Sequence, residues 1–299
     1  MSRLLVLGNA GLDISLAVPR LPLAGETLVG GERHGAPGGK GLNQAVVAAR
    51  TGRLAVVFRA PLGNDAEAAM IADRLAGEPF AALELPRQAG PSDLSVLLVA
   101  PDAENCIVTA GARAAALPAE DAARFAAACQ PGEWLLLQGN LSAAATAAAL
   151  RAAGGPVMLN TAPLLWDAAP MLAYCAVVVA NAVEARQITG QDGPAAAMAL
   201  RAAGPALAIV TLGAAGCIAA GPDGVRRHAA PQVRAVDSSG AGDAFCGVLA
   251  AMLASGSPAA PAIAAAQQAA ALTVTRPGAY AALPSAAELR SLPGLRGSA

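Results

Sequence analysis

A stretch of small residues from Asp237 to Asp243 offers the clearest chemistry in the sequence. It reads Asp-Ser-Ser-Gly-Ala-Gly-Asp, and the residues from Phe245 to Leu253 that follow it have apolar side chains at helical spacing. A loop therefore opens a helix here. The glycines at 240 and 242 allow a tight turn that exposes backbone N–H groups, and the positive end of the helix dipole adds to them. The segment Gly240, Ala241 and Gly242 is predicted to bind an anion.

Asp243 stands at the start of the same helix, and two interpretations of its carboxylate are open. It caps the helix N-terminus, as aspartate commonly does, or it acts as a base beside a bound phosphate. In the second interpretation Asp243 takes a proton from a hydroxyl, while the backbone amides before it hold the phosphoryl group that the hydroxyl attacks. The stretch alone does not decide between them.

A second glycine cluster, Gly35 to Gly41, also leads into a predicted helix. It does not fit the phosphate-binding P-loop, because Gly41 stands where a serine or threonine would bind magnesium. It does not fit the dinucleotide fingerprint either, because Gln44 replaces the third glycine. Lys40, the only lysine in the chain, and Asn43 are left to offer donors and acceptors to a hydroxylated ligand.

Strand and helix patterns alternate along most of the chain, which predicts an α/β fold with a doubly wound, mostly parallel sheet and helices on both faces. The carboxyl ends of such strands line one crevice, so residues far apart in sequence meet there. Predicted strands lie at 4–8, 54–60, 134–138, 157–159, 176–180 and 208–211. Polar residues and a glycine stand at the exits of predicted strands or at a helix start, namely Asp13, Asn140, Asn160, Asn181, Glu184, Thr211, Gly213 and Asp243.

Two segments outside this alternation are predicted to form a small β-sheet flap. Residues 14–35 contain prolines and glycines without a helical run, and residues 93–109 have the pattern of a hairpin. The chain shows no internal repeat and no linker long enough to separate independent domains. We therefore expect residues 1–299 to form a single domain that carries the flap.

Composition excludes several classes of function. A net charge of −1 without a basic stripe argues against nucleic-acid binding. The absence of an apolar run of about 18 residues argues against a membrane span, and the N-terminal residues have the pattern of a first strand, so we expect a cytoplasmic protein. The five cysteines are widely separated and only two histidines occur, which supports neither a zinc site nor a disulfide framework.

Taken together, the motifs resemble those of the ribokinase-like, PfkB-type carbohydrate kinases. The stretch from Gly38 to Ala45 is similar to the first signature of that family, and Asp237 to Phe245 is similar to the second. Between and after them, further matches stand in the expected order, namely Asn160–Pro163, Asn181–Glu184, Thr211–Gly216 and Val274–Gly278. The resemblance covers nearly the whole chain.

This resemblance implies an ATP-dependent kinase that phosphorylates a primary hydroxyl of a small sugar, with Mg²⁺ and a monovalent cation such as K⁺. Asp243 would be the base, and Gly240, Ala241 and Gly242 the anion hole. The implied sugar contacts are Gly11, Asp13, Gly39, Lys40, Gly41, Asn43, Asn140 and Asp243. ATP would be held by Asn181, Glu184, Thr211, Leu212, Gly213, Gly216, Gly242 and Gln267, with Glu184 also acting indirectly on Mg²⁺. The implied cation site comprises Asp237, Ser239, Thr273, Arg276 and Gly278. The flap corresponds to the β-lid that pairs subunits in this family, which implies a homodimer.

Three positions depart from the ribokinase pattern. Gly11 stands where ribokinases usually have an asparagine, Asn140 where they use a glutamate, and Ala282 where a serine is common near the cation. Ribose is the first acceptor to test, with another pentose, a ketohexose or a nucleoside as alternatives, and the cation dependence is expected to be weaker. Two other classes remain, a non-catalytic sugar- or nucleotide-binding protein and a nicotinamide-dependent oxidoreductase.

Overall fold

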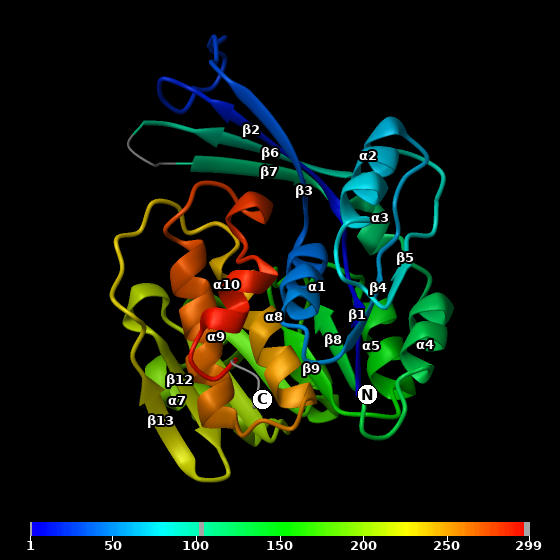
Figure 1. The fold of residues 1–299 in the computed structure, drawn as a ribbon, viewed down its shortest axis with the longest axis vertical. Helices are drawn as coiled ribbons and strands as arrows, with labels where there is room; N and C mark the ends of the chain where they lie inside the picture. The colour runs from blue at the N-terminus through cyan, green and yellow to red at the C-terminus, as the bar shows by residue number, and fades with distance from the viewer. Residues whose placement is uncertain (1, 102–104, 296–299) are drawn as a thin grey trace.

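The computed structural model describes residues 2–101 and 105–295, and within them nine strands form one large sheet (Figure 1). All neighbouring strands pair in parallel except β12 and β13, which form an antiparallel hairpin at one edge. The predicted doubly wound sheet is confirmed, whereas this hairpin was not predicted. In spatial order the strands are β13 (Gly224–His228), β12 (Cys217–Gly221), β11 (Leu207–Thr211), β10 (Val177–Asn181), β9 (Val157–Asn160), β8 (Trp134–Gln138), β1 (Arg3–Leu7), β4 (Ala55–Arg59) and β5 (Ala82–Glu84).

Helices cover both faces of the large sheet because the strands are apolar on both sides. In β1, for example, Leu4 and Val6 belong to one hydrophobic cluster, and Leu5 and Leu7 belong to another. The first cluster includes α1 (Lys40–Arg50), α2 (Ala66–Leu75), α8 (Ala241–Ala254) and α9 (Ala259–Thr273). The opposite face is covered by α4 (Ala119–Ala127), α5 (Ala143–Ala152), α6 (Ala182–Thr189) and α7 (Gly193–Ala202), and short helices α3 (Ala112–Ala115) and α10 (Ala286–Ser291) complete the fold.

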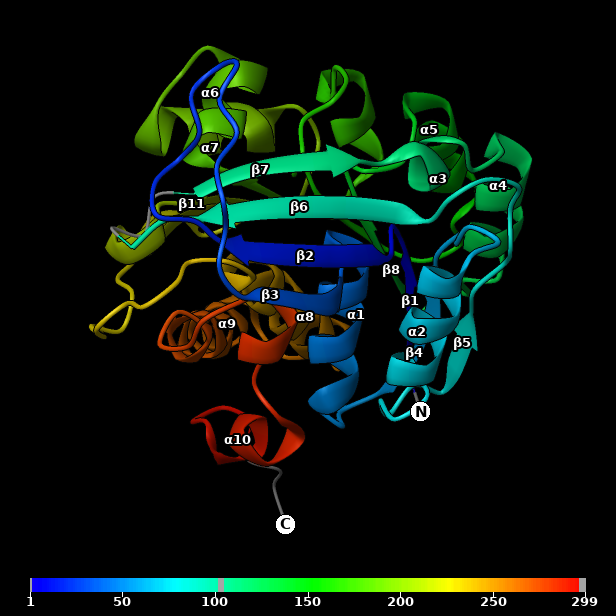
Figure 2. The same cartoon turned by 90° about the horizontal axis from the view of Figure 1, so that it is seen from above.

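A separate small sheet lies across one end of the molecule, above the N-terminal ends of α1 and α8 (Figures 1 and 2). Its strand order is β3 (Arg33–Gly38), β2 (Gly11–Ala17), β6 (Asp93–Val99) and β7 (Asn105–Ala110). Only the central pair, β2 and β6, is parallel. We call this sheet the lid.

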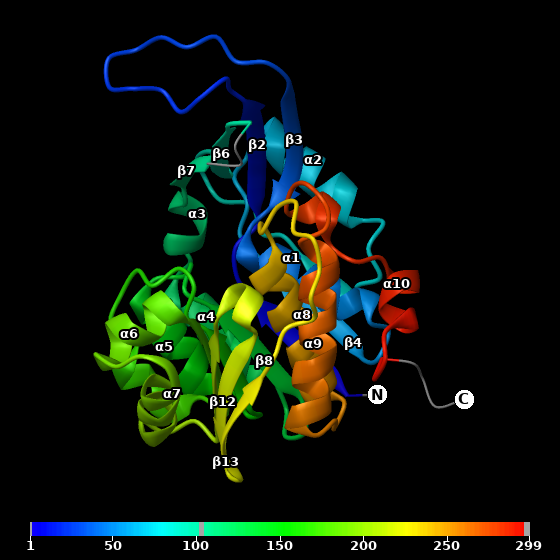
Figure 3. The same cartoon turned by 90° about the vertical axis from the view of Figure 1, so that its left-hand side faces the viewer.

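The lid contains strands from both segments of the predicted flap, but the strands cover only part of those segments. Of the predicted segment 14–35, only the two ends are strands, and residues 18–32 form a loop that projects beyond the sheet (Figure 3). The hairpin predicted over 93–109 forms from β6 and β7, but residues 102–104 of it lie outside the described residues. Residues 1 and 296–299 of the predicted domain lie outside them as well.

Gly11 and Asp13 lie in a lid strand instead of at the exit of β1. Gly11 pairs with Gly38 of β3 and with Asp93 of β6. A Cβ atom at Gly11 would lie 2.5 Å from the backbone oxygen of Asp93, so β2 and β6 approach this closely only because residue 11 is glycine. The early start of β2 places Asp13 on the lid.

None of the helices in residues 2–101 and 105–295 has the combination of length and apolarity that crossing a bilayer requires.

Candidate active site

Asp243 lies where the two glycine-rich segments of the sequence meet. Gly240 is the N-cap of α8 and has a left-handed backbone, with φ of 76°, so Asp243 falls in the first turn of the helix. Its side chain is buried, with one oxygen, Oδ2, accepting a hydrogen bond from Asn43 Nδ2 at 3.1 Å. The other, Oδ1, accepts one from Gln44 Nε2 at 3.1 Å. The structure therefore brings together residues that are about 200 positions apart.

The first turn of α8 also presents backbone N–H groups next to this carboxylate. The N–H groups of a first helical turn have no partner inside their helix. That of Ala241 donates to the Ser238 oxygen at 3.3 Å. The space around Gly242 is open, since a Cβ atom there would meet nothing within 4 Å. The geometry leaves room for an anion at Gly242, beside Asp243.

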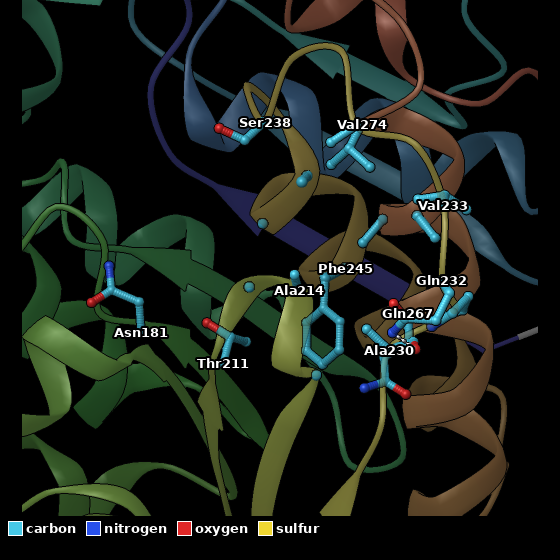
Figure 4. Close-up of a pocket in the computed structure, with 18 residues that line it drawn as sticks. Asn181, Thr211, Ala214, Ala230, Gln232, Val233, Ser238, Phe245, Gln267 and Val274 are labelled. Carbon is cyan, nitrogen blue, oxygen red and sulfur yellow. Dashed lines mark hydrogen bonds between the residues drawn. The ribbon is translucent and has the colours of Figure 1, made fainter. Parts of the chain in front are cut away.

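A cavity of about 600 Å³ extends from this helix end along α9 to the exits of β10 and β11 (Figure 4). Its volume falls within the range of small-molecule and cofactor sites. Of the residues predicted to hold ATP, six line it, namely Asn181, Thr211, Gly213, Gly216, Gly242 and Gln267. Sequence reasoning missed the apolar wall that includes Phe245, Val233 and Val274, because in sequence Phe245 is indistinguishable from the core face of its helix.

A second cavity of about 100 Å³ adjoins this space and has Asp243 in its wall. Its wall includes Lys40, Asp243, Asn160, Glu184 and Cys246. It shares three lining residues with the larger cavity, namely Asn181, Thr211 and Gly242. The two cavities therefore adjoin at these residues, next to the carboxylate of Asp243.

Glu184 is held rigidly at the wall of the small cavity. Its Oε2 atom accepts hydrogen bonds from Thr161 Oγ1 and from the Asn181 N–H, both at 3.0 Å. In return, Asn181 Oδ1 accepts from the Glu184 N–H at 2.8 Å, which completes a capping box at the start of α6. No group of three or more His, Cys, Asp or Glu residues that could hold a metal occurs in the described part of the chain. One fixed carboxylate fits a magnesium ion reached through water or phosphate oxygens.

Of two residues predicted to hold ATP, Gln267 lines the large cavity and Leu212 does not. Gln267 lines the large cavity, and its Nε2 donates to the His228 backbone oxygen at 2.9 Å, which ties α9 to β13. Leu212 packs with the hydrophobic cluster under α6 and α7 and is not part of the cavity wall. At Gly216, φ is 88° and a Cβ atom would lie 2.0 Å from the His228 oxygen, so this turn requires glycine.

Asp13 reaches from the lid toward the start of α1. A Cβ atom at Gly38 would lie 2.0 Å from Asp13 Oδ2, so the carboxylate lies directly over bare backbone. Burial raises the pKa of Asp13 to about 6; a hydrogen bond from Ser95 opposes the rise, the charge of Asp243 adds to it, and Lys40 opposes it. Asp13 is therefore close enough to Lys40 and Asp243 for their charges to act on its pKa.

Asn9, which the sequence analysis did not single out, holds the start of α1. Its Oδ1 atom accepts from the Gly41 N–H, and its backbone oxygen accepts from the Leu42 N–H, both at 3.0 Å. A Cβ atom at Gly41 would lie 2.6 Å from the Asn9 nitrogen, and one at Gly39, where φ is 110°, would lie 2.9 Å from Asn9 Nδ2. Gly39 and Gly41 thus let α1 approach the end of β1. An asparagine directly after a buried strand was the available signal.

Two of the residues predicted to contact a sugar have a buried side-chain carbonyl oxygen without a hydrogen-bond partner among the described residues. The two oxygens are Asn43 Oδ1 and Asn140 Oδ1. Asn140 lies just after the end of β8, while Asn160 and Asn181 are the last residues of β9 and β10. All three asparagines therefore lie at the carboxyl-end edge of the large sheet. Buried carbonyls without a partner are costly, and hydroxyl groups of a ligand are suitable donors for them.

The fold and the order of the motifs agree with one known protein family. The family model described as pfkB family carbohydrate kinase matches residues 1–286. The chain belongs to this family. It therefore has the fold of an enzyme that phosphorylates carbohydrates, in agreement with the geometry around Asp243.

Individual relatives in the family are ribokinases. The chain is 32% identical over 263 residues to a ribokinase of Mus musculus, an alignment that covers 83% of this chain and 81% of that protein. Among solved structures, ribokinase of Thermotoga maritima has a TM-score of 0.90 and 26% identity, with 99% of this chain and all of the other covered. Arabidopsis thaliana ribokinase, solved with ribose and ATP, has a TM-score of 0.85 and 26% identity, and both chains are covered in full.

The loop where the family resemblance implies a cation is held together by Asp237. Asp237 Oδ1 accepts from the Ser239 N–H and Oδ2 from the Gly278 N–H, both at 2.8 Å. Although burial acts in the opposite direction, these N–H donors hold the pKa of Asp237 below its usual value. The Arg276 guanidinium pairs with Glu288, so only the Arg276 backbone is available to a cation. The predicted segments therefore meet, but Ala282, which is buried here, supplies no hydroxyl ligand.

Proposed function

We propose that this carbohydrate kinase transfers the γ-phosphoryl group of ATP to a primary hydroxyl of ribose. The observation that carries the proposal is the position of Asp243, which is buried in the wall of the small cavity together with Lys40, next to the large cavity. The ribokinase relatives, which align over most of the chain, support ribose as the acceptor.

In this proposal Asp243 removes the proton of the hydroxyl that attacks the γ-phosphorus. General-base assistance of this kind contributes roughly 10²- to 10⁴-fold. The N–H groups of the segment Gly240 to Gly242 would bind the phosphoryl oxygens, and Lys40 at the wall of the small cavity would add a positive charge. Mg²⁺, when bound with ATP through Glu184, would neutralise phosphate charge.

The large cavity is the proposed ATP site. The turn from Thr211 to Gly216 would follow the phosphates, Asn181 would contact them where the two cavities join, and Gln267 would lie toward adenine. Phe245 and Val233 give an apolar surface suited to a flat ring. The assignment of Leu212 to ATP rests on its backbone alone, since its side chain packs into the protein.

The sugar would lie between the lid and the start of α1, against Asp13, Lys40, Asn43 and Gly39. Gly11 offers no side chain, and the space for one is filled by β6. Asn140 offers a neutral amide in place of a carboxylate. Both differences remove contacts to sugar hydroxyls, so discrimination among small sugars is expected to be weaker than in a site with both groups. Another pentose, a ketohexose or a nucleoside is therefore the alternative acceptor.

A panel of sugars and nucleosides, assayed for ADP release with Mg²⁺ and ATP, tests the proposal. We expect ribose to give the highest kcat/KM. Each reaction is run with K⁺ and with Na⁺, and we expect turnover to differ by less than about tenfold, because the proposed cation site has one fixed carboxylate and no serine at 282. No turnover with any pentose would reject ribose. If sugar and ATP bind but no ADP is released, the protein is a non-catalytic binding protein. If it binds NAD in a titration, the oxidoreductase alternative is favoured.

Asp13 gives a pH dependence to sugar binding. The ionised carboxylate only accepts hydrogen bonds, whereas the protonated form also donates one and loses the negative charge. Burial raises the pKa of Asp13 to about 6, the charge of Asp243 adds to the rise, and Ser95 and Lys40 oppose it. Below pH 6 the group becomes protonated, so we expect the sugar dissociation constant to rise by up to about tenfold per pH unit there and to be constant above pH 7. Calorimetric titration at pH 5, 6 and 8 measures it. The dependence should disappear in Asp13→Asn, and its persistence there would assign it to another group.

We also propose that the lid pairs two subunits. Exposed apolar side chains occur on the lid at Val99 and Val108 and on the loop 18–32 that projects from it at Leu23 and Val29, with exposed fractions between 40% and 86%. Burial of such side chains against a second lid would be favourable.

The cytoplasmic location expected from the sequence stays a prediction.

A further inference from the structure

Gln44 has every hydrogen-bonding atom of its side chain engaged. The side chain is completely buried in α1. Its Nε2 atom donates twice, to Asp243 Oδ1 at 3.1 Å and to Asn160 Oδ1 at 3.0 Å. Its Oε1 atom accepts from Gln138 Nε2 at 3.0 Å. A buried amide with both N–H groups and its carbonyl satisfied is held in one orientation.

The partners of Gln44 form a chain from the carboxylate into the large sheet. Gln138 ends β8 and is completely buried, and Asn160 ends β9. Asn160 is itself fixed, because its Nδ2 donates to the Val179 oxygen of β10 at 3.1 Å. The orientation of Gln44 is thus set by two neighbouring strands of the sheet, which are among the most rigid parts of the fold.

The helix that carries Gln44 lies very close to the helix that carries Asp243. At Gly247, a Cβ atom would lie 2.5 Å from the Gln44 backbone oxygen, so α1 and α8 are in contact at backbone level here. This contact fixes the distance between the two helices, and therefore the distance between the side chains of Gln44 and Asp243. Gln44 itself lines neither cavity.

Gln44 and Asn43 divide the two oxygens of Asp243 between them. Asn43 takes Oδ2 and keeps a buried carbonyl without a protein partner, which suits a ligand hydroxyl. Gln44 takes Oδ1 and has no remaining group for a ligand. Asn43 therefore belongs to the sugar site, whereas Gln44 acts on the carboxylate alone.

We propose that Gln44 is a positioning residue, which fixes the rotation of the Asp243 carboxylate so that it faces the acceptor hydroxyl and the anion site. The inference rests on the proposed function, since it concerns the residue proposed as base. Correct orientation of a catalytic group lowers the barrier of the chemical step without tightening substrate binding. Loss of Gln44 should therefore affect kcat and leave the binding constants nearly unchanged.

The decisive variant is Gln44→Met, which keeps the length of the side chain and removes its hydrogen bonds. We expect kcat to fall by about 10- to 100-fold and the dissociation constants of sugar and ATP to change less than about threefold. The same substitution in an Asp243→Asn background should lower the residual turnover by less than about twofold, because a residue that acts through Asp243 has no further effect once the base is absent. Equal losses in both backgrounds, or unchanged kcat, would overturn the proposal.

Thr51→Val is the matched control. Thr51 is buried at the C-terminal end of the same helix, where its Oγ1 donates to the Ala48 oxygen at 2.6 Å. We expect it to lower the melting temperature without changing kcat, which separates damage to α1 from loss of positioning. If Gln44→Met does not fold, Gln44→Glu takes its place, since it keeps the acceptor for Gln138; wild-type turnover in that variant would contradict the proposal.

The measurements use whichever acceptor the wild-type enzyme phosphorylates. If ribose is not phosphorylated in the substrate panel, the proposed substrate is rejected. The comparison of Gln44→Met in the wild-type enzyme and in Asp243→Asn can still be made with the true acceptor. Conversely, equal effects of Gln44→Met in both backgrounds would reject the positioning role in an active ribose kinase.

Discussion

Replacing Asp243 with asparagine is expected to lower kcat by at least about a hundredfold while sugar and ATP still bind. An amide cannot accept the proton that a general base must remove. The substitution preserves size, and Asn43 can still donate to the amide oxygen in place of a carboxylate oxygen. The fold and both cavities should persist, so the loss reports on chemistry.

The measurement combines steady-state kcat with calorimetric dissociation constants for the sugar and for ATP. Unchanged dissociation constants and a large fall in kcat would support the assignment of Asp243 as base. Turnover close to that of the wild-type enzyme would show that another group takes the proton. A melting temperature near that of the wild type confirms that the buried site is intact.

Gly38→Ala is expected to raise the sugar dissociation constant by at least about tenfold and to leave ATP binding unchanged. The new Cβ atom would lie 2.0 Å from Asp13 Oδ2 and 2.2 Å from its Cγ, so the carboxylate must move away from its position. Because the obstructing atoms belong to the end of a side chain, the protein can still fold. The cost therefore falls on the contact between Asp13 and the sugar.

Gly35→Ala provides a control in the same strand, since a Cβ atom at Gly35 would meet nothing within 4 Å. We expect it to bind sugar like the wild type. Sugar dissociation constants of the two variants, measured side by side, test the role of Asp13 without removing its charge. Equal binding by Gly38→Ala and wild type would show that the position of this carboxylate does not matter to the sugar.

The sequence predicted the large sheet and the convergence of Asn160, Glu184 and Asp243, because residues at the carboxyl ends of parallel strands lie at one edge of the sheet. The proximity of Asn43 to Asp243 was implied only by the family resemblance. The sequence did not predict the role of Gln44. In the sequence Gln44 was noted as a mismatch to the dinucleotide fingerprint and as part of the first family signature, without a role of its own. Its contacts depend on where α1 crosses α8. The cavity wall at Phe245 was hidden for a similar reason: an apolar helical stripe has the same pattern against a core as against a ligand pocket.

Local patterns also failed where pairing between distant strands decides the structure. The hairpin of β12 and β13 was missed, although Cys217 to Gly221 is apolar, since short strands at a sheet edge depend on their partner more than on their own residues. Gly11 was expected in a loop, but the lid strands on both sides extend β2 to include it.

Asp13 belongs to the lid, whereas Asp243 begins a helix of the large sheet. In the proposed function, part of acceptor recognition is thus carried by a sheet that is separate from the residues proposed for bond making. Exchange of β2 and β6 for the corresponding strands of another member of the family offers a route to altered acceptor preference in which the reactive groups stay in place.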